Sequence, residues 1–362
     1  MARSRLHELS ERGVAVWFDT LSRDLVASGT LARMMEEDAV TGVTSNPTIF
    51  QKALAEGTAY DDQLRELGGD PKDAFFALAL DDISNACDVL RPVWDDGKGL
   101  HGWVSMEVDP TLAYDTEATL EQALWIAATV DKPNLYVKIP ATEEGLPAIE
   151  ESIAQGVSVN VTLIFGLERY AAVVEAYIRG VERFVASGGD ARSVASVASF
   201  FVSRVDTETD NRLWDDALKG KLAVANAKLA YRHFLDTFSG PRWQELEDAG
   251  ASKQWCLWAS TSTKNPAYRD VVYVEELIAP DTVNTMPLET IRAFQDHGEV
   301  RGDTALEGLD EARALLDELR AAGIDYDDVV ETLEAEGVQK FVDSFHALID
   351  GLRAKQGELA AR

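Results

Sequence analysis

The stretch Leu135-Tyr136-Val137-Lys138-Ile139-Pro140 is a short apolar run that contains one cation. Such a run is typical of a strand that is covered on both faces, as in parallel sheets. Burial of Lys138 would favour its neutral amine, and a neutral amine can attack a carbonyl group to form a Schiff base. The alternative is an edge or snorkelling lysine whose ammonium stays in water. The hexapeptide alone leaves both interpretations open.

Seven other short β-rich runs occur, several of them apolar almost throughout, and segments with helical apolar spacing, such as 117–129 and 168–187, lie between the runs. Eight strands that alternate with helices predict an α/β fold, a parallel TIM (β/α)8 barrel. A doubly wound open sheet is the competing arrangement, but no Gly-x-Gly-x-x-Gly follows the first run, and a count of eight favours closure. The eight runs are 15–19, 42–46, 103–108, 135–140, 157–165, 193–201, 254–260 and 282–286.

The length of 362 residues fits either two average domains or one large barrel. No Pro- or Ser-rich linker, internal repeat or low-complexity block separates a second domain. We therefore expect residues 1–362 to form a single (β/α)8-barrel domain. Residues 310–361 have helical periodicity, and we expect them to form a helical C-terminal extension packed on the barrel.

The chain is acidic, with 63 Asp plus Glu against 34 Lys plus Arg and a formal net charge of −29. Such a surface repels nucleic acid and anionic membranes, so neither is expected as a partner. No apolar run is long enough to span a bilayer, and residues 1–8 lack the apolar segment of a signal peptide. Cys87 and Cys256 are isolated and the five His residues show no close pairing, so we expect no disulfide framework and no metal site. These features together favour the cytoplasm.

Polar side chains recur inside or just after the predicted strands, where a TIM barrel places its chemistry. Any one of them has an ordinary structural explanation: Asp19 suits a helix N-cap and Arg204 a surface ion pair. Their recurrence around one ring is harder to explain by structure alone. The candidates are Asp19, Asn46, Glu107, Lys138, Asn160, Thr162, Ser199, Arg204 and Lys264.

A Schiff base at Lys138 requires a proton shuttle, because a carbinolamine must form and lose water. Glu107, one strand away, is the candidate for proton transfer, and Thr162, on the other neighbouring strand, could hold the relaying water. The resulting iminium is an electron sink. It allows the bond between the third and fourth carbons of the substrate to break when a base removes the proton of the hydroxyl on the fourth carbon. We expect Asp19 to be that base.

The remaining candidates suit the rest of a phosphorylated sugar. Asn46 and Asn160 can form hydrogen bonds to the hydroxyls of the bound three-carbon fragment without adding charge. Arg204 and Lys264 supply two cations, with Ser199 as a neutral donor, for a terminal phosphate.

Four motifs occur in matching order over about residues 14–297. They are Thr44-Ser45-Asn46-Pro47-Thr48, Ser105-Met106-Glu107-Val108-Asp109 with Tyr114-Asp115-Thr116-Glu117, Lys138-Ile139-Pro140-Ala141-Thr142, and Asn160-Val161-Thr162-Leu163-Ile164-Phe165. Together these motifs resemble transaldolase. This resemblance implies a class I aldolase-type barrel of carbohydrate metabolism that needs no metal or organic cofactor. It also implies a reaction of the non-oxidative pentose phosphate pathway: a dihydroxyacetone unit moves from sedoheptulose 7-phosphate to glyceraldehyde 3-phosphate, giving erythrose 4-phosphate and fructose 6-phosphate.

The resemblance also implies a role for each matching residue. The Schiff-base lysine of the family falls on Lys138, its proton-relay residues on Glu107 and Thr162, and its acid/base aspartate on Asp19. Its substrate-holding residues fall on Asn46, Asn160, Ser199 and Arg204.

One position departs from the family pattern. Many members have an arginine in the loop after strand seven, where this chain has Lys264, which keeps the charge but not the bidentate fork. The longer C-terminal tail resembles a subgroup found in actinobacteria and plants. Both a monomer and a homodimer are compatible with the sequence.

Two alternatives remain. Fructose 6-phosphate aldolase, a smaller relative, releases free dihydroxyacetone, but those enzymes have Gln where Glu107 stands and Tyr where Phe201 stands. We therefore expect transfer, with Phe201 beside the substrate. A non-catalytic phosphosugar-binding barrel is the second alternative, but it has no need of a desolvated lysine next to a carboxylate.

Overall fold

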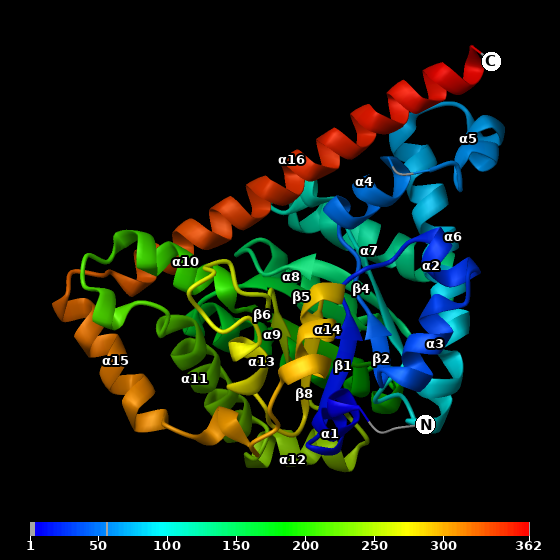
Figure 1. Cartoon of the computed structure of the whole chain (residues 1–362). Coiled ribbons are helices and arrows are strands. Elements are labelled where there is room, and N and C mark those ends of the chain that lie inside the picture. Colours follow the sequence, from blue (N-terminus) through cyan, green and yellow to red (C-terminus); the bar gives the residue numbers. More distant parts are fainter. Residues whose placement is uncertain (1–3, 56, 362) are drawn as a thin grey trace.

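The computed structural model describes residues 4–55 and 57–361. Residues 1–3, which begin the N-terminal stretch considered above, lie outside this description. Eight parallel strands close into a barrel in sequence order, and helices surround it (Figure 1). The predicted TIM barrel is thus confirmed. Its strands are β1 (Val14–Phe18), β2 (Val40–Val43), β3 (Trp103–Glu107), β4 (Leu135–Pro140), β5 (Val159–Ile164), β6 (Ser196–Phe201), β7 (Trp255–Ala259) and β8 (Thr282–Met286).

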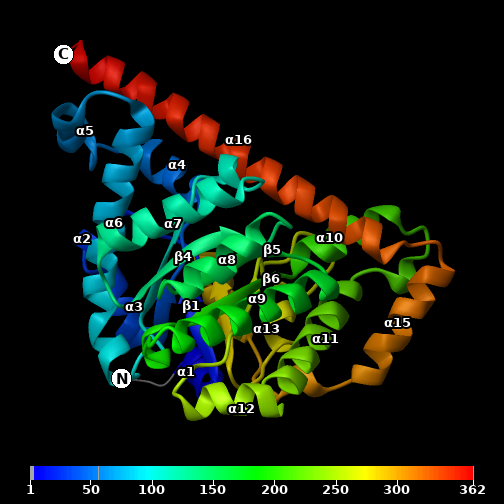
Figure 2. The same cartoon turned by 180° about the vertical axis from the view of Figure 1, so that it is seen from behind.

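Helices occupy the connections and the C-terminal end, and α7, α8, α9 and α11 pack around the outside of the strands (Figure 2). Local signals explain their starts: the Asp70 side chain accepts hydrogen bonds from the amides of Lys72 and Asp73, and proline occupies the first turn of the helix that follows. The helices are α1 (Arg5–Glu11), α2 (Arg23–Ala27), α3 (Thr30–Glu37), α4 (Pro47–Ala55), α5 (Asp61–Leu67), α6 (Pro71–Asp96), α7 (Thr116–Val130), α8 (Gly145–Ala154), α9 (Leu167–Ala186), α10 (Ser203–Arg212), α11 (Leu222–Thr237), α12 (Pro241–Asp248), α13 (Val272–Glu275), α14 (Leu288–His297), α15 (Leu309–Ala321) and α16 (Tyr326–Ala360).

Aromatic side chains fill the amino-terminal end of the barrel. The rings of Trp103 and Tyr136 stack with centroids 3.9 Å apart, and Trp17 lies 6.1 Å from Tyr136. A Cβ at Gly42 would come within 2.6 Å of the Trp17 indole, so the indole packs directly on that backbone. A packed end leaves the carboxyl end of the strands as the place for chemistry.

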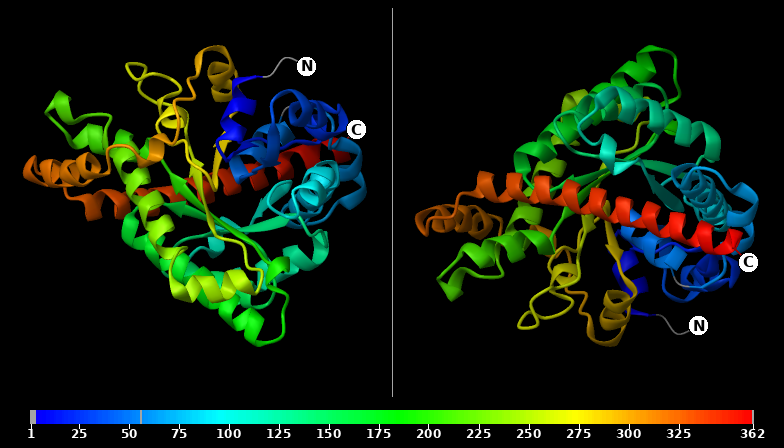
Figure 3. Two further views of the ribbon diagram at one scale, coloured as in Figure 1. Left: turned by 90° about the horizontal axis from the view of Figure 1, so that it is seen from below. Right: turned by 90° about the horizontal axis from the view of Figure 1, so that it is seen from above.

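The long helix α16 crosses that carboxyl end. It packs against α4, α10 and the short 3-10 helix Pro110–Leu112, which follow β2, β6 and β3, and it also contacts β5. Views from the side and from above show it running across the mouth of the barrel (Figures 1 and 3). None of the helices in the described part of the chain is long and apolar enough to cross a membrane.

Candidate active site

Lys138 lies inside the barrel on β4, directly paired with Glu107 on β3. Its Nζ is 3.9 Å from Glu107 Oε2 and donates a hydrogen bond of 3.4 Å to the carbonyl oxygen of Ser45. The two side chains are only 7% and 4% exposed. The burial that the hexapeptide suggested is therefore present, and a carboxylate stands beside the amine.

The Glu107 carboxyl lies 3.9 Å from Lys138 Nζ, which is too far for a hydrogen bond. Among the described residues, neither of its oxygens has a hydrogen-bond partner. Burial raises the pKa of Glu107 to about 7; the charge of Lys138 opposes this rise and Asp19 adds to it. A carboxyl group with such a pKa is present in both protonation states near neutral pH, as general acid–base catalysis requires.

Thr162 stands on β5, on the other side of Lys138 from Glu107. Its hydroxyl is fully buried and has no hydrogen-bond partner within the described chain. The next residue, Leu163, has a φ of +61°, and the pairing of β5 with β6 shifts register between Val161 and Ile164. A left-handed leucine costs roughly 1–2 kcal/mol, and such irregularities commonly redirect side chains next to functional sites.

A line of hydrogen bonds crosses the barrel interior through Asn160. Its Nδ2 donates to Ser105 Oγ at 3.0 Å, and its Oδ1 accepts from Ser199 Oγ at 2.7 Å. Asn160 also pairs in register with Lys138. These hydrogen bonds fix the orientation of the Asn160 amide beside Lys138. We expected the Ser199 hydroxyl to donate to the phosphate of the substrate, but in this structure it donates to Asn160 Oδ1.

Asp19 follows β1 at the mouth of the barrel. Its Oδ1 accepts a hydrogen bond of 2.7 Å from the Thr44 hydroxyl, which also contacts the Thr285 hydroxyl at 2.8 Å. Burial raises the pKa of the Asp19 carboxyl, while the Thr44 hydrogen bond and the positive charge of Lys138 act in the opposite direction. The carboxyl group therefore lies within the electrostatic reach of Lys138, as its expected role requires.

Asn46 lies in the loop between β2 and α4, because β2 ends at Val43 and not at Asn46 as predicted. The Asn46 Oδ1 accepts a hydrogen bond of 3.0 Å from the amide of Ile49, so the side chain caps α4. Its NH2 group is the part that could bind a substrate hydroxyl. The neighbouring Ser45 is tied to β3, since its hydroxyl donates to the Ser105 carbonyl at 2.8 Å.

Two cations, Arg204 and Lys264, lie at the mouth of the barrel, after β6 and β7. The Arg204 guanidinium, near the start of α10, stacks over the Phe201 ring at 5.1 Å, and its Nη1 is buried without a partner among the described residues. Lys264, in the loop after β7, donates to Ser262 Oγ at 2.8 Å. Burial and then the charge of Arg204 lower the pKa of Lys264, so the two cations repel each other. A guanidinium with one nitrogen unpaired among the described residues, close enough to an ammonium to repel it, suits an anionic group.

Three contributors were not among the candidates from the sequence. Thr44 and Ser105 lie inside the motifs quoted above, so those motifs could have indicated them. Phe341 lies on α16, with its ring centroid 5.9 Å from Lys138 Nζ. No local motif near Phe341 points to a catalytic site. Within the described ranges, no cluster of three or more His, Cys, Asp or Glu side chains could hold a metal ion.

Comparisons with known proteins identify the family of the chain. The family model described as Transaldolase/Fructose-6-phosphate aldolase matches residues 16–352. A protein of Parafrankia sp. (strain EAN1pec) named Transaldolase is 53% identical over 365 aligned positions, covering 98% of this chain and 99% of its own. Another of that name, from Acidothermus cellulolyticus, is 54% identical and covers 95% of this chain and 94% of its own. The chain therefore belongs to the transaldolase/fructose-6-phosphate aldolase family.

Proposed function

We propose that this enzyme carries out the transaldolase reaction through a Schiff base on Lys138. It is a transferase of the pentose phosphate pathway, which moves a dihydroxyacetone unit from sedoheptulose 7-phosphate to glyceraldehyde 3-phosphate. Its family supports phosphorylated sugars as the substrates. The observation that supports the catalytic assignment best is the buried Lys138 amine, 3.9 Å from a Glu107 carboxylate that makes no hydrogen bond within the described chain.

In the first half of the reaction, Lys138 Nζ adds to the ketone carbon of the donor sugar. Glu107 supplies the proton with which the carbinolamine oxygen leaves as water, and the Thr162 hydroxyl holds the water through which that proton moves. The product of this step is an iminium ion, with the sugar joined to Lys138. Burial around Lys138 and Glu107 allows their charges to act strongly on the reacting atoms.

In the second half, Asp19 takes the proton from the hydroxyl on the fourth carbon. The bond between the third and fourth carbons breaks, its electron pair enters the iminium to give an enamine, and the aldose phosphate leaves. Asn160 and Asn46 hold the hydroxyls of the three-carbon fragment, while Arg204 and Lys264 bind the phosphate. The enamine then adds to the aldehyde carbon of the acceptor, and the same steps run in reverse to release the new ketose phosphate.

Borohydride trapping tests the covalent step. Incubation with fructose 6-phosphate and borohydride should reduce the iminium and add the mass of a reduced three-carbon or six-carbon adduct to the peptide that contains Lys138. Lys228 is the matched control, since it is also buried and lies 3.3 Å from a glutamate, Glu276. An unlabelled Lys138, or label on Lys228, would refute the assignment.

A coupled assay separates transfer from cleavage. Fructose 6-phosphate with erythrose 4-phosphate should give glyceraldehyde 3-phosphate and sedoheptulose 7-phosphate at the rate of the acceptor reaction. Without the acceptor, formation of glyceraldehyde 3-phosphate should fall to a small fraction of that rate. Equal rates in both reactions, with free dihydroxyacetone as product, would instead identify a fructose 6-phosphate aldolase.

We also propose partners, location and domain organisation from the charge, the cysteines and the layout of the chain. The net charge of −29 opposes nucleic acid as a partner, so a small anionic substrate has to be held by a local cationic pair, Arg204 and Lys264. The two isolated cysteines support a cytoplasmic location. We treat residues 1–362 as one domain, with residues 310–361 as its helical extension. Size-exclusion chromatography with light scattering would decide between monomer and homodimer.

A further inference from the structure

One face of α16 is directed at the catalytic end of the barrel. Gly337, Phe341 and Phe345 follow each other at intervals of four residues, so they lie on the same side of the helix. All three are buried. Phe345 lines a small cavity together with Ser45, Asn46 and Glu107. The helix therefore supplies side chains to the site from the far end of the sequence.

Gly337 sets how closely α16 approaches the strands. A Cβ at this position would lie 3.1 Å from Leu163 Cδ2 and 3.3 Å from the Phe165 ring. Leu163 lies in the irregular end of β5, next to Thr162, and Phe165 directly follows this strand. The glycine thus allows the helix to pack directly over the strand end that bears the proposed relay threonine.

Phe341, one turn further along, lies over the nucleophile. Its ring centroid is 5.9 Å from Lys138 Nζ, and the residue is only 5% exposed. A cation at this distance is within the range in which the aromatic face attracts it. An iminium nitrogen formed at Lys138 would occupy the same place, with the buried Phe341 ring between it and the backbone of α16.

The position of the Phe341 ring over Lys138 matters for the intermediate of the transfer reaction. After the aldose phosphate has left, the three-carbon unit remains on Lys138 as an enamine. If the enamine takes a proton on its terminal carbon, it becomes the iminium of dihydroxyacetone. Water then adds to the iminium carbon, loses a proton, and the carbon–nitrogen bond breaks, which releases free dihydroxyacetone and the Lys138 amine. Because both the proton donor and the excess water come from solvent, access to the nitrogen controls this loss.

We propose that Phe341 is a positioning residue that shields the Lys138-bound three-carbon unit from bulk water and so sets the ratio of transfer to hydrolytic release. This proposal rests on the Schiff base proposed above. It adds to that function a contribution of the C-terminal helix. Phe341 needs no contact with the phosphate or the sugar hydroxyls for this role.

Phe341→Ala tests the proposal with fructose 6-phosphate as donor and erythrose 4-phosphate as acceptor. Free dihydroxyacetone and sedoheptulose 7-phosphate are measured in the same reaction. The ratio of release to transfer should rise about tenfold, a difference of one order of magnitude in relative rate constants. Phe341→Leu keeps most of the side-chain volume and should raise the ratio less, which provides a folded variant should the alanine variant be unstable.

Leu352→Ala is the matched control, because Leu352 is a buried residue of the same helix that lines a groove with Leu54 and Thr58, away from Lys138. It should loosen α16 and leave the ratio unchanged. An equal rise in this control would assign the effect to general loosening of the helix and overturn the proposal. A Phe341→Ala variant that slows both reactions with an unchanged ratio would also overturn it. Failure of borohydride to label Lys138 in the unmodified protein would instead refute the Schiff base itself.

Discussion

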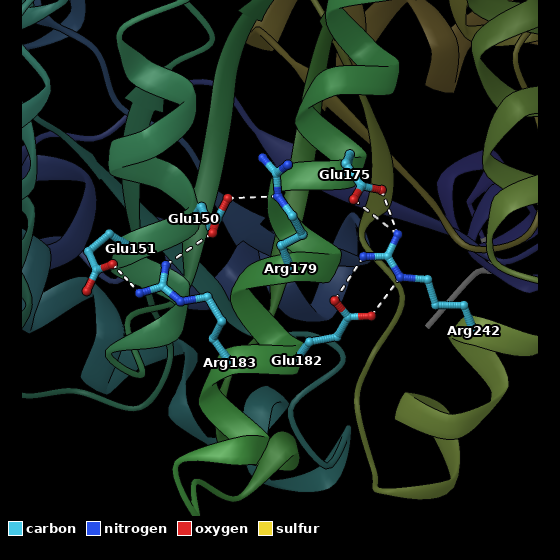
Figure 4. A network of polar contacts seen from close by, with 7 residues as sticks. All are labelled: Glu150, Glu151, Glu175, Arg179, Glu182, Arg183 and Arg242. Atoms are coloured by element: carbon cyan, nitrogen blue, oxygen red, sulfur yellow. Dashed lines mark hydrogen bonds and ion pairs between the residues drawn. The ribbon is translucent and has the colours of Figure 1, made fainter.

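Two groups of charges in this molecule differ in almost every respect. On the outside of the barrel, α8, α9 and α12 carry a network of ion pairs in which Arg242 makes hydrogen bonds of 2.6 to 3.1 Å to Glu175 and Glu182 (Figure 4). Inside the barrel, Lys138 and Glu107 are 3.9 Å apart. The outer arginine is 47% exposed, and the inner lysine is 7% exposed.

The charged groups of the outer network make shorter hydrogen bonds, but they are less suited to proton transfer than the inner pair. In the outer network, the hydrogen bonds from Arg242 lower the pKa of Glu182, which therefore stays ionised at neutral pH. In the interior, desolvation raises the pKa of Glu107 to about 7, so that carboxyl can exchange a proton under working conditions. A buried carboxyl group without hydrogen bonds is therefore the candidate for proton transfer. An exposed carboxylate with all its hydrogen bonds made is the candidate for a structural role.

Removal of Lys138 should have the largest effect. Lys138→Ala eliminates the nucleophile, so kcat for the coupled transfer reaction should fall by about four orders of magnitude or more. Circular dichroism and thermal unfolding should show a folded protein. Lys138→Arg, which keeps a charge but cannot form the Schiff base, should be equally inactive. Turnover above a tenth of the original rate in either variant would mean that the inner charge pair is not the catalytic one.

Glu107→Gln should have the next largest effect, because it keeps the shape of the side chain but removes proton transfer. We expect kcat to fall by about 10²- to 10³-fold, with donor binding retained. Glu107 is mainly protonated below a pKa of about 7 and mainly ionised above it, so the limb of the pH–rate profile near pH 7 should disappear in the variant.

Glu182→Gln provides the control from the outer network and should leave both kcat and the pH profile unchanged. If the limb near pH 7 persists in Glu107→Gln, the group that titrates there is a different one, and the contrast between the two regions loses its chemical basis.

The sequence predicted the barrel and the place of Lys138 because buried parallel strands are nearly continuous apolar runs and barrels place chemistry at their carboxyl ends. It misplaced the end of β2, since Asn46 caps α4 instead of continuing the strand. The periodicity of the C-terminal tail predicts helix but does not indicate which surface that helix covers. The proximity of Phe341 to Lys138 is a long-range contact, and the same is true of the Ser199–Asn160 hydrogen bond.

The cations at the mouth of the barrel are less buried than the Lys138–Glu107 pair and less fully paired than the outer network. Their removal should therefore have effects of intermediate size on activity. Arg204 is partly buried and leaves Nη1 unpaired within the described chain, so Arg204→Ala should raise KM for fructose 6-phosphate by roughly 30-fold or more, as for loss of a desolvated charge. Lys264 is more exposed than Arg204, although it is partly desolvated, so it should matter less, and Lys264→Ala should raise KM by about 3- to 10-fold.

Lys340, an exposed cation on α16 whose nearest ion-pair partner is Glu336 at 3.6 Å, provides the control for general charge effects. Lys340→Ala should leave KM within about twofold of its original value, as is usual for an exposed ion pair. Lys264→Arg would supply a bidentate fork for the phosphate and should lower KM. A larger rise in KM for Lys264→Ala than for Arg204→Ala would show that the burial of each cation does not determine how much it contributes to phosphate binding.

Arg242→Ala should have the smallest effect, although Arg242 makes the most hydrogen bonds of the charges compared here. Exposed ion pairs gain little because water and salt screen them, so the free energy of unfolding should fall by only about 1 kcal/mol. Urea unfolding at low and at high salt should show this loss shrinking as the salt concentration rises, and kcat should not change. A loss of several kcal/mol, or a change in kcat, would mean that the outer network supports the barrel strands and that the two regions are mechanically connected.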